Sequence, residues 1–388
     1  MKHRLAEDTI SRNELESLTQ WILQGNKLTK GEQTLKLEEE FSDFIGSKHS
    51  IFVNSGSSAN LLSIYSAKIS GRLRNNIAIA PAVSWVTTVT PLLQFGFETH
   101  LCDADPQNLG LDLNHFEELC RLHRPSIAIL VHVLGHSNHM QEILEICERY
   151  GVCLIEDTCE ALGSEYCDSK LGTFGLSGTF SFYYGHHVST IEGGMVITDD
   201  DELSSVMKSV RSHGWSRDLP KELMKALQIR HKVDEFRNLY TFYWEGFNLR
   251  STDLQAFIGR SQVKKLPGIG LIRNNNLEHY RRFLPNYYRQ NCNSSFVSNF
   301  AFGTLVQNPH ETFQVLQENG IETRPLICGN IARHPFWIER FGKSNLKVAD
   351  VVHDYGIYLP NHANLKEPDI EEICGIFSSI AIPHNLKR

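Results

Sequence analysis

Residues 178–194 read GTFSFYYGHHVSTIEGG, and this stretch decides how the rest of the chain is interpreted. Small, aromatic and β-branched residues around Tyr183 and Tyr184 predict a strand that ends in a constrained loop. Two adjacent histidines, His186 and His187, follow, and the stretch closes on an acidic residue and a glycine pair. No lysine occurs in residues 171–206. The loop therefore carries two imidazole side chains and no lysine amine.

This loop resembles the cofactor-anchoring loop of the DegT/DnrJ/EryC1 sugar-nucleotide aminotransferases, which are pyridoxal-phosphate enzymes of fold type I. The loop of that family has Ser-Phe, three variable residues, a lysine and then Glu-Gly-Gly. Here Ser181 and Phe182 match, Glu-Gly-Gly matches at residues 192–194, and the lysine position holds His186. A shift of one residue in the loop would select His187 instead, so the sequence leaves the choice between the two histidines open.

The exchange of lysine for histidine changes the chemistry that the loop can perform. A lysine amine forms a Schiff base with an aldehyde, whereas imidazole takes and gives protons near neutral pH. Within the family, the resemblance then narrows to the 3-dehydratases of nucleotide-linked 4-keto-6-deoxy-hexoses, which use pyridoxamine phosphate. The plain alternative is that His186 and His187 form a packed or surface dipeptide without chemistry.

Length and composition are those of an ordinary globular protein. The chain has 388 residues, 41% of them hydrophobic, and a formal net charge of -7. A negative net charge does not favour nucleic-acid binding. We also expect no signal peptide and no membrane span, so the predicted location is the cytoplasm. The nine cysteines are scattered without a CxxC motif, which predicts reduced thiols, no iron–sulfur cluster and no metal site.

Two segments predict contacts to the coenzyme. Residues 51–62 read IFVNSGSSANLL, a short strand, a turn and a helix start, which is a ready phosphate site. The resemblance assigns Gly56, Ser57 and Ser58 to the coenzyme phosphate, and the alternative is that Ser58 is an ordinary N-cap. It also assigns Trp85 to stacking on the pyridine ring, with a core tryptophan as the alternative.

The apolar strand at residues 152–157, VCLIED, ends on Asp157. Ligands of open α/β sheets bind outside the carboxyl ends of the strands, so a carboxylate there can pair with a protonated pyridine nitrogen. An acidic residue that merely closes a strand is the alternative. Glu160 departs from the residue usual in the family, and its predicted contact with the ring, like that of Ser181, follows from the resemblance alone.

Three residues are predicted to act on the substrate side or across a subunit boundary. Arg217 and Arg324 are candidate contacts to the nucleotide phosphates or the sugar, because guanidinium suits phosphate; a solvated or structural arginine is the alternative at each. Residues 246–250, GFNLR, match a family segment whose asparagine reaches the coenzyme phosphate of the partner subunit. By this resemblance Asn248 implies a homodimer with shared active sites.

The predicted fold is α/β, that of fold type I pyridoxal-phosphate transferases, with a large domain on a mainly parallel sheet and a small C-terminal domain. Alternation of buried strands and helices over residues 51–210 supports α/β without the resemblance. We expect an N-terminal arm and large domain over residues 1–255, and a linker helix and small domain over residues 256–388. Residues 221–238 are predicted as a charged loop, and helices are predicted at residues 253–265 and 272–283.

The hypothesis for function is C3 deoxygenation of a nucleotide-linked 4-keto-6-deoxy-hexose, GDP-4-keto-6-deoxy-mannose by analogy, for a surface polysaccharide such as lipopolysaccharide O-antigen. The expected cofactors are pyridoxal and pyridoxamine phosphate, with glutamate as the amino donor. One rival is an ordinary nucleotide-sugar aminotransferase that uses another lysine, Lys170 or Lys208. A second rival is a non-catalytic relative that binds nucleotide sugar.

Overall fold

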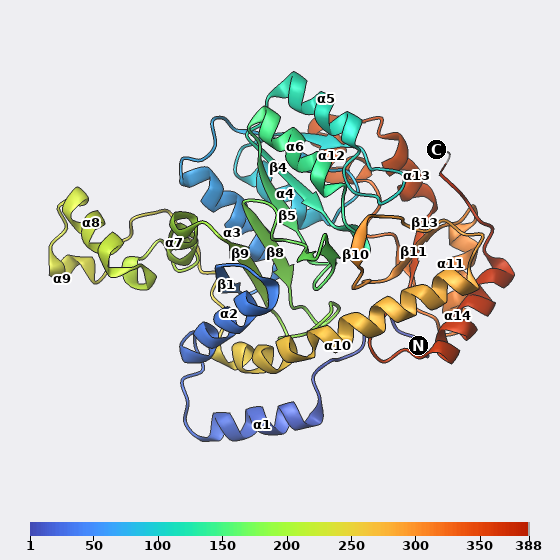
Figure 1. The fold of residues 1–388 in the computed structure, drawn as a ribbon, viewed down its shortest axis with the longest axis horizontal. Helices are drawn as coiled ribbons and strands as arrows, with labels where there is room; N and C mark the ends of the chain where they lie inside the picture. The colour runs from blue at the N-terminus through green and yellow to red at the C-terminus, as the bar shows by residue number, and fades with distance from the viewer. Residues whose placement is uncertain (387–388) are drawn as a thin grey trace.

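The computed structural model describes residues 1–386, and its centre is a seven-stranded sheet with helices on both faces (Figure 1). The strands, in spatial order, are β1 (His49–Val53), β9 (Gly194–Thr198), β8 (Ser177–Ser181), β5 (Cys153–Asp157), β4 (Ile127–Val131), β2 (Ile77–Pro81) and β3 (Glu98–Cys102). Strand β9 is antiparallel to β1 and β8, and the other adjacent pairs are parallel. The predicted mainly parallel sheet is confirmed.

Strand β4 shows why these segments read as apolar runs. All five of its residues are buried. Ile127 and Ile129 pack in the core on one face of the sheet, whereas Ala128 and Leu130 pack in the core on the other face. Because successive side chains of a strand point to opposite faces, a strand covered on both sides must be apolar throughout.

Helices cover both faces of the sheet. On one face lie α3 (Gly56–Ile69), α4 (Val86–Gln94) and α7 (Asp201–Val210), and on the other lie α2 (Glu32–Ile45), α5 (Leu113–His123) and α6 (Met140–Tyr150). This three-layer arrangement directs the carboxyl ends of the parallel strands, and the helix N-termini that follow them, toward one edge of the sheet.

A single long helix, α10 (Asp253–Phe283), occupies the place of the two predicted helices. It begins with a capping box between Thr252 and Gln255 and continues through Pro267. It packs against α2 in the large domain and against α14 in the small domain, and α1 (Arg12–Leu23) lies beside it. The predicted domain boundary at residue 255 falls inside its first turn and stays a prediction.

The C-terminal region has its own three-stranded antiparallel sheet, and a third small sheet lies between the two regions. Their elements, with the short 3-10 helices, are β11 (Phe302–Leu305), β13 (Gly356–Leu359), β12 (Arg324–Pro325), α11 (Pro309–Glu318), α12 (Pro335–Phe341), α13 (Lys347–Tyr355), α14 (Glu367–Ile380), β10 (Ser294–Phe296), β6 (Glu165–Tyr166), β7 (Ser169–Lys170), η1 (Val133–Gly135), η2 (Ser216–Asp218) and η3 (Ile331–Arg333). Within residues 1–386, no helix has the length and apolar character needed to cross a bilayer.

The prediction of a loop at residues 221–238 is wrong. The segment forms α8 (Lys221–His231) and α9 (Glu235–Asn238), which project from the body of the molecule at the left of Figure 1. Residues 221–228 read KELMKALQ, and these are strong helix formers whatever their polarity. The propensity signal was present, but the sparse apolar pattern concealed it.

Candidate active site

A cavity of about 600 Å³ opens at the carboxyl ends of β5 and β8. Asp157 and Ser181 line it from the sheet, Arg324 and Tyr358 line it from the small C-terminal sheet, and Leu5 lines it from the N-terminal segment. Its size and its place outside the strand ends are typical of ligand sites in α/β proteins.

The turn between β1 and α3 forms one wall of this cavity. Ser55, Gly56 and Ser57 line it, and the Ser57 hydroxyl lies 2.9 Å from Thr87 Oγ1. The N-cap of α3 is Ser55, whose Oγ accepts a hydrogen bond of 3.0 Å from the Ser58 N–H. The alternative that Ser58 is the N-cap is therefore wrong. The Ser58 hydroxyl accepts a hydrogen bond from Ser55 Oγ and is not on the cavity wall, and its contact with the coenzyme phosphate stays a prediction. The phosphate candidates on the wall are therefore Ser55 and Ser57.

Gly56 lets this turn approach the sheet closely. A Cβ at this position would lie 2.6 Å from the Cβ of Ser181 and 3.1 Å from the Sγ of Cys159. The absence of a side chain therefore allows the N-terminus of a 14-residue helix to meet the end of β8. Free N–H groups and hydroxyls at such a terminus suit a phosphate, so the turn fits the coenzyme phosphate that the sequence predicts.

Asp157 lies at the floor of the cavity and is 4% exposed. Its Oδ2 accepts hydrogen bonds from Asn60 Nδ2 at 2.8 Å and from Thr88 Oγ1 at 2.7 Å. Its Oδ1 accepts one from the Cys159 N–H at 3.1 Å. These donors fix the carboxylate in one orientation, as an ion pair with a protonated ring nitrogen requires. Asn60 and Thr88 were not singled out from the sequence.

Trp85 precedes the first residue of α4, and its side chain lies on the cavity wall. The residue is 55% exposed, so the alternative interpretation as a core tryptophan is wrong. An aromatic face open to the cavity suits a planar ring.

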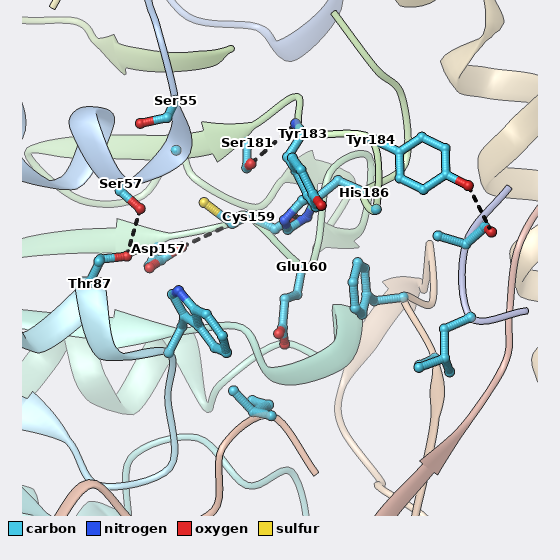
Figure 2. A pocket seen from close by; sticks show the side chains of 18 of the residues that line it. Ser55, Ser57, Thr87, Asp157, Cys159, Glu160, Ser181, Tyr183, Tyr184 and His186 are labelled. Atoms are coloured by element: carbon cyan, nitrogen blue, oxygen red, sulfur yellow. Dashed lines mark hydrogen bonds between the residues drawn. The ribbon is translucent and has the colours of Figure 1, made fainter. Parts of the chain in front are cut away.

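The two histidines of the loop have different environments. His186 lines the cavity, and its Nδ1–H donates to the carbonyl oxygen of Cys159 at 2.8 Å (Figure 2). This bond leaves Nε2 as the nitrogen that can accept a proton. His187 is fully buried, does not line the cavity, and its Nε2–H donates to the Ser298 carbonyl at 2.9 Å. The structure thus brings His186, and not His187, to the cavity.

Arg273 of α10 lies behind the histidine loop. Its buried guanidinium donates to the carbonyl oxygens of Phe300 at 3.0 Å and of His186 at 3.4 Å. Burial lowers the pKa of His186 to about 4, and the positive charge of Arg273 acts in the same direction. The imidazole is therefore neutral at physiological pH and can serve as a base.

Glu160 also faces the cavity (Figure 2). Its Oε2 accepts a hydrogen bond of 2.9 Å from the Leu134 N–H. Burial raises the pKa of Glu160 to about 7, with a further contribution from the negative charge of Asp157. This carboxyl group can therefore hold or release a proton near neutral pH.

The remaining predicted residues divide between cavity and surface. Arg324 lines the cavity, and its Nη2 donates to Glu322 Oε1 at 3.1 Å. Arg217 is exposed beside the ring of Trp215, 5.5 Å from its centroid, and is not on the cavity wall. Asn248 is exposed and also off the wall, although its segment pairs with the chain just before Ser55 through a Leu249 carbonyl. A contribution of Asn248 to a partner's site stays a prediction.

The two lysines of the rival hypothesis lie elsewhere. Lys170 pairs with Glu165 at 3.1 Å and stacks over Phe44. Lys208 lines a separate surface depression beside Glu38. Among residues 1–386, the wall of the cavity contains no lysine.

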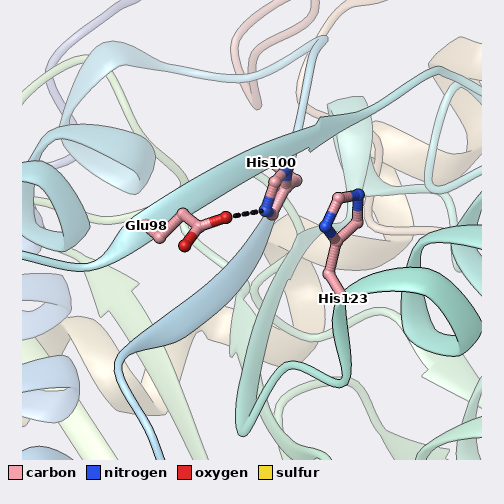
Figure 3. A group of neighbouring side chains, drawn as sticks. All are labelled: Glu98, His100 and His123. Atoms are coloured by element: carbon pink, nitrogen blue, oxygen red, sulfur yellow. Dashed lines mark hydrogen bonds and ion pairs between the residues drawn. The ribbon is translucent and has the colours of Figure 1, made fainter.

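A possible metal-binding group lies outside the cavity. Glu98 and His100 are on the same face of the edge strand β3, and His123 is at the end of α5 (Figure 3). Their candidate ligand atoms all lie within 4.8 Å of one another, and the two imidazole rings are stacked with centroids 3.6 Å apart. Parallel rings direct their lone pairs side by side rather than toward one point, so a metal would require the rings to splay. The group has no connection to the chemistry of the cavity.

The fold and the cavity together define a pyridoxal-phosphate enzyme of fold type I. Residues 9–378 match the DegT/DnrJ/EryC1/StrS aminotransferase family, and the chain belongs to that family. The family and fold predicted from the sequence are confirmed.

Relatives of known activity lie within this family. The chain is 33% identical over 371 residues to GDP-4-keto-6-deoxy-D-mannose 3-dehydratase of Yersinia pseudotuberculosis, covering 92% of this chain and 93% of that protein. Its structure resembles that of GDP-4-keto-6-deoxymannose-3-dehydratase with a trapped PLP-glutamate geminal diamine (TM-score 0.88, 30% identity, 97% of this chain and 100% of that one). A histidine-to-asparagine variant of that enzyme, ColD, with bound GDP-perosamine is similar too (TM-score 0.87, 30% identity, 97% and 100% covered).

Proposed function

We propose that the protein is a pyridoxamine-phosphate-dependent 3-dehydratase, which removes the C3 hydroxyl of a nucleotide-linked 4-keto-6-deoxy-hexose. The substrate by analogy with its relatives is GDP-4-keto-6-deoxy-mannose. One observation carries the proposal: His186 lies on the cavity wall, and no lysine of residues 1–386 does. Such a wall can move protons but cannot anchor an aldehyde as an imine, which distinguishes elimination from ordinary transamination.

The residues of the cavity can hold the coenzyme without a covalent bond. Pyridoxamine phosphate, when bound, supplies an amine that condenses with a ketone and a ring that accepts electrons. Ser55, Ser57 and the N-terminus of α3 would hold its phosphate, and Asp157 would keep its ring nitrogen protonated. Trp85 would restrain the ring by contact with its face, which matters more without a covalent tether.

His186 would perform the proton transfers. Its Nδ1–H donates to the Cys159 carbonyl, so Nε2 is the atom that would accept the proton removed from the methylene carbon of the coenzyme. The resulting imidazolium can donate the same proton to the departing C3 hydroxyl, which leaves as water. A neutral imidazole at the start of the cycle is required for this sequence, and the low pKa of His186 provides it.

The wider setting follows from the same proposal. We expect glutamate as the amino donor, in line with the relative whose structure contains a PLP-glutamate adduct. We also expect a cytoplasmic homodimer in which Asn248 completes the partner's site. The dideoxy sugar would serve a surface polysaccharide such as lipopolysaccharide O-antigen.

Incubation of the protein with pyridoxamine phosphate, glutamate and a panel of 4-keto nucleotide sugars tests the proposal. Mass spectrometry should show a sugar that has lost one oxygen atom, with ammonia and 2-oxoglutarate formed in equal amounts. A product that carries an amine in place of the C4 ketone and retains the C3 hydroxyl would establish the aminotransferase instead. Binding without any product would establish the non-catalytic relative.

A further inference from the structure

The N-terminal segment, residues 2–9, crosses the mouth of the cavity as a strap that is fixed at both ends. At its start, the Lys2 and His3 N–H groups donate to the Gly320 carbonyl, and the Glu322 N–H donates to the His3 carbonyl at 2.8 Å. At its end, Thr9 Oγ1 donates to Gln262 Oε1 of α10 at 2.6 Å. The strap therefore joins the small sheet to the long helix.

Between these anchors, Arg4, Leu5 and Ala6 line the cavity. The Leu5 N–H donates to Glu322 Oε2 at 3.0 Å, and the Tyr184 hydroxyl donates to the Ala6 carbonyl at 3.4 Å. Together with the bonds of His3, these bonds hold the backbone on both sides of Arg4. The guanidinium of Arg4 is thus presented by an ordered segment to the cavity and not by a loose end.

The positively charged side chains of the cavity wall come from the strap and the small sheet. Arg4 and Arg324 are the arginines on its wall, and within residues 1–386 no lysine joins them. Glu322 lies between them and uses both carboxylate oxygens, one for the Leu5 N–H and one for Arg324. In the described part of the chain the exposed Arg4 side chain has neither an ion pair nor a hydrogen bond, so no protein group competes with an anionic ligand for it.

The turn between β1 and α3, which would hold the coenzyme phosphate, lies on the far side of the cavity from the strap. Figure 2 shows Ser55 and Ser57 at one side of the site and Tyr184, which bonds the strap, at the other. A coenzyme phosphate held at the α3 turn therefore leaves Arg4 free for a second anion. Guanidinium groups bind phosphate oxygens in pairs, and a diphosphate offers oxygens enough for two of them.

We infer that Arg4, on its strap, binds the diphosphate of the nucleotide sugar together with Arg324. The inference rests on the proposed function for the class of ligand, but it concerns the diphosphate and not the deoxygenation. Arg4 was not identified from the sequence, because residues 1–10 show no motif and reach the cavity only through their pairing with residues 320–322.

Calorimetric titration of the cofactor-loaded protein with GDP, UDP, dTDP and CDP tests the inference. For the nucleotide that binds most tightly, Arg4→Gln should weaken binding about 10- to 100-fold, as expected for a lost charge-assisted contact. Arg4→Lys keeps the charge but loses the paired hydrogen bonds, so its nucleotide affinity should fall between those of the wild type and Arg4→Gln. The matched control is Arg12→Gln, because Arg12 is 90% exposed, pairs with Glu16 and lies off the cavity wall.

Unchanged nucleotide affinity in Arg4→Gln, or equal losses in Arg4→Gln and Arg12→Gln, would overturn the inference, as would a wild-type protein that binds none of the four nucleotides. The melting temperature and the cofactor absorbance should be the same in all variants, which separates a lost contact from misfolding. Tightest binding of a nucleotide other than GDP, with the Arg4 effect intact, would contradict only the GDP linkage of the proposed function.

Discussion

The two sides of the cavity are built in different ways. On the sheet side, Asp157 and the turn at Ser55 stand at ends of strands and helices, and short hydrogen bonds within one chain fix them. On the mouth side, Arg4 and Arg324 come from a strap and a two-residue strand, and both residues are exposed. Rigid elements thus hold the part that would bind the coenzyme, while long-range pairing forms the part that would bind the substrate.

The largest expected effect concerns the histidine loop on the sheet side. His186→Asn should lower turnover about 10²- to 10⁴-fold, because it removes the group that transfers the proton. His187→Asn is the matched control at the adjacent position: it should retain turnover but unfold at lower temperature, since it loses the buried bond to the Ser298 carbonyl. Rates of sugar deoxygenation and thermal unfolding of both variants measure this.

Loss of turnover in His187→Asn with a folded protein, and full turnover in His186→Asn, would reverse the assignment. It would also mean that the buried His187 reaches the cavity during the reaction. The different environments of the two histidines would then belong to one conformation of the loop.

The second test asks whether the sheet side, where the coenzyme phosphate would bind, is completed by a second subunit. Asn248→Ala and His186→Asn should each be almost inactive alone. When the two are unfolded and refolded together, mixed dimers should contain one intact site each, so activity should return to about a quarter of the wild-type value if subunits associate at random. Activity of the mixture no greater than that of the separate variants would place Asn248 outside the partner's site.

The smallest expected effect concerns Glu160 and depends on pH. Burial raises the pKa of Glu160 in the folded protein to about 7, above its ordinary value of 4.5. The fold therefore favours the protonated form and loses stability as pH rises from about 4.5 through 7. Glu160→Gln stays neutral and should therefore gain about 1–2 kcal/mol over the wild type between pH 5 and pH 8. Chemical denaturation at the two pH values measures the difference, and Glu192→Gln, at an exposed position on the wall, is the control. A stability difference that does not change with pH would show that Glu160 is ionised throughout.

What the sequence could predict follows the same division. The apolar run at β4 and the carboxylate at the end of β5 are local signals, and both predictions agree with the fold. Asp157 and Trp85 were found because one residue in a strand–turn–helix unit fixes its own place. The alternative of an N-cap at Ser58 is wrong because residues 55–58 contain three serines, and only the backbone decides that Ser55 caps the helix.

Features that depend on distant contacts could not be predicted in this way. Asn60 of α3 and Thr88 of α4 bind Asp157 at the end of β5, and Arg273 reaches the histidine loop from α10. No spacing along the chain encodes these pairs. The continuous α10 was missed for another reason: Pro267 and the glycines around it indicate a break, but packing against α2 and α14 maintains the helix.

One short stretch after β5 has two tasks. The carboxylate of Asp157 and the carbonyl of Cys159 are two residues apart, and the first would set the charge of the ring while the second sets which nitrogen of His186 carries the proton. A small displacement of this stretch would change ring electronics and base tautomer in a single movement. A substitution that disturbs its backbone should consequently weaken coenzyme binding and proton transfer together.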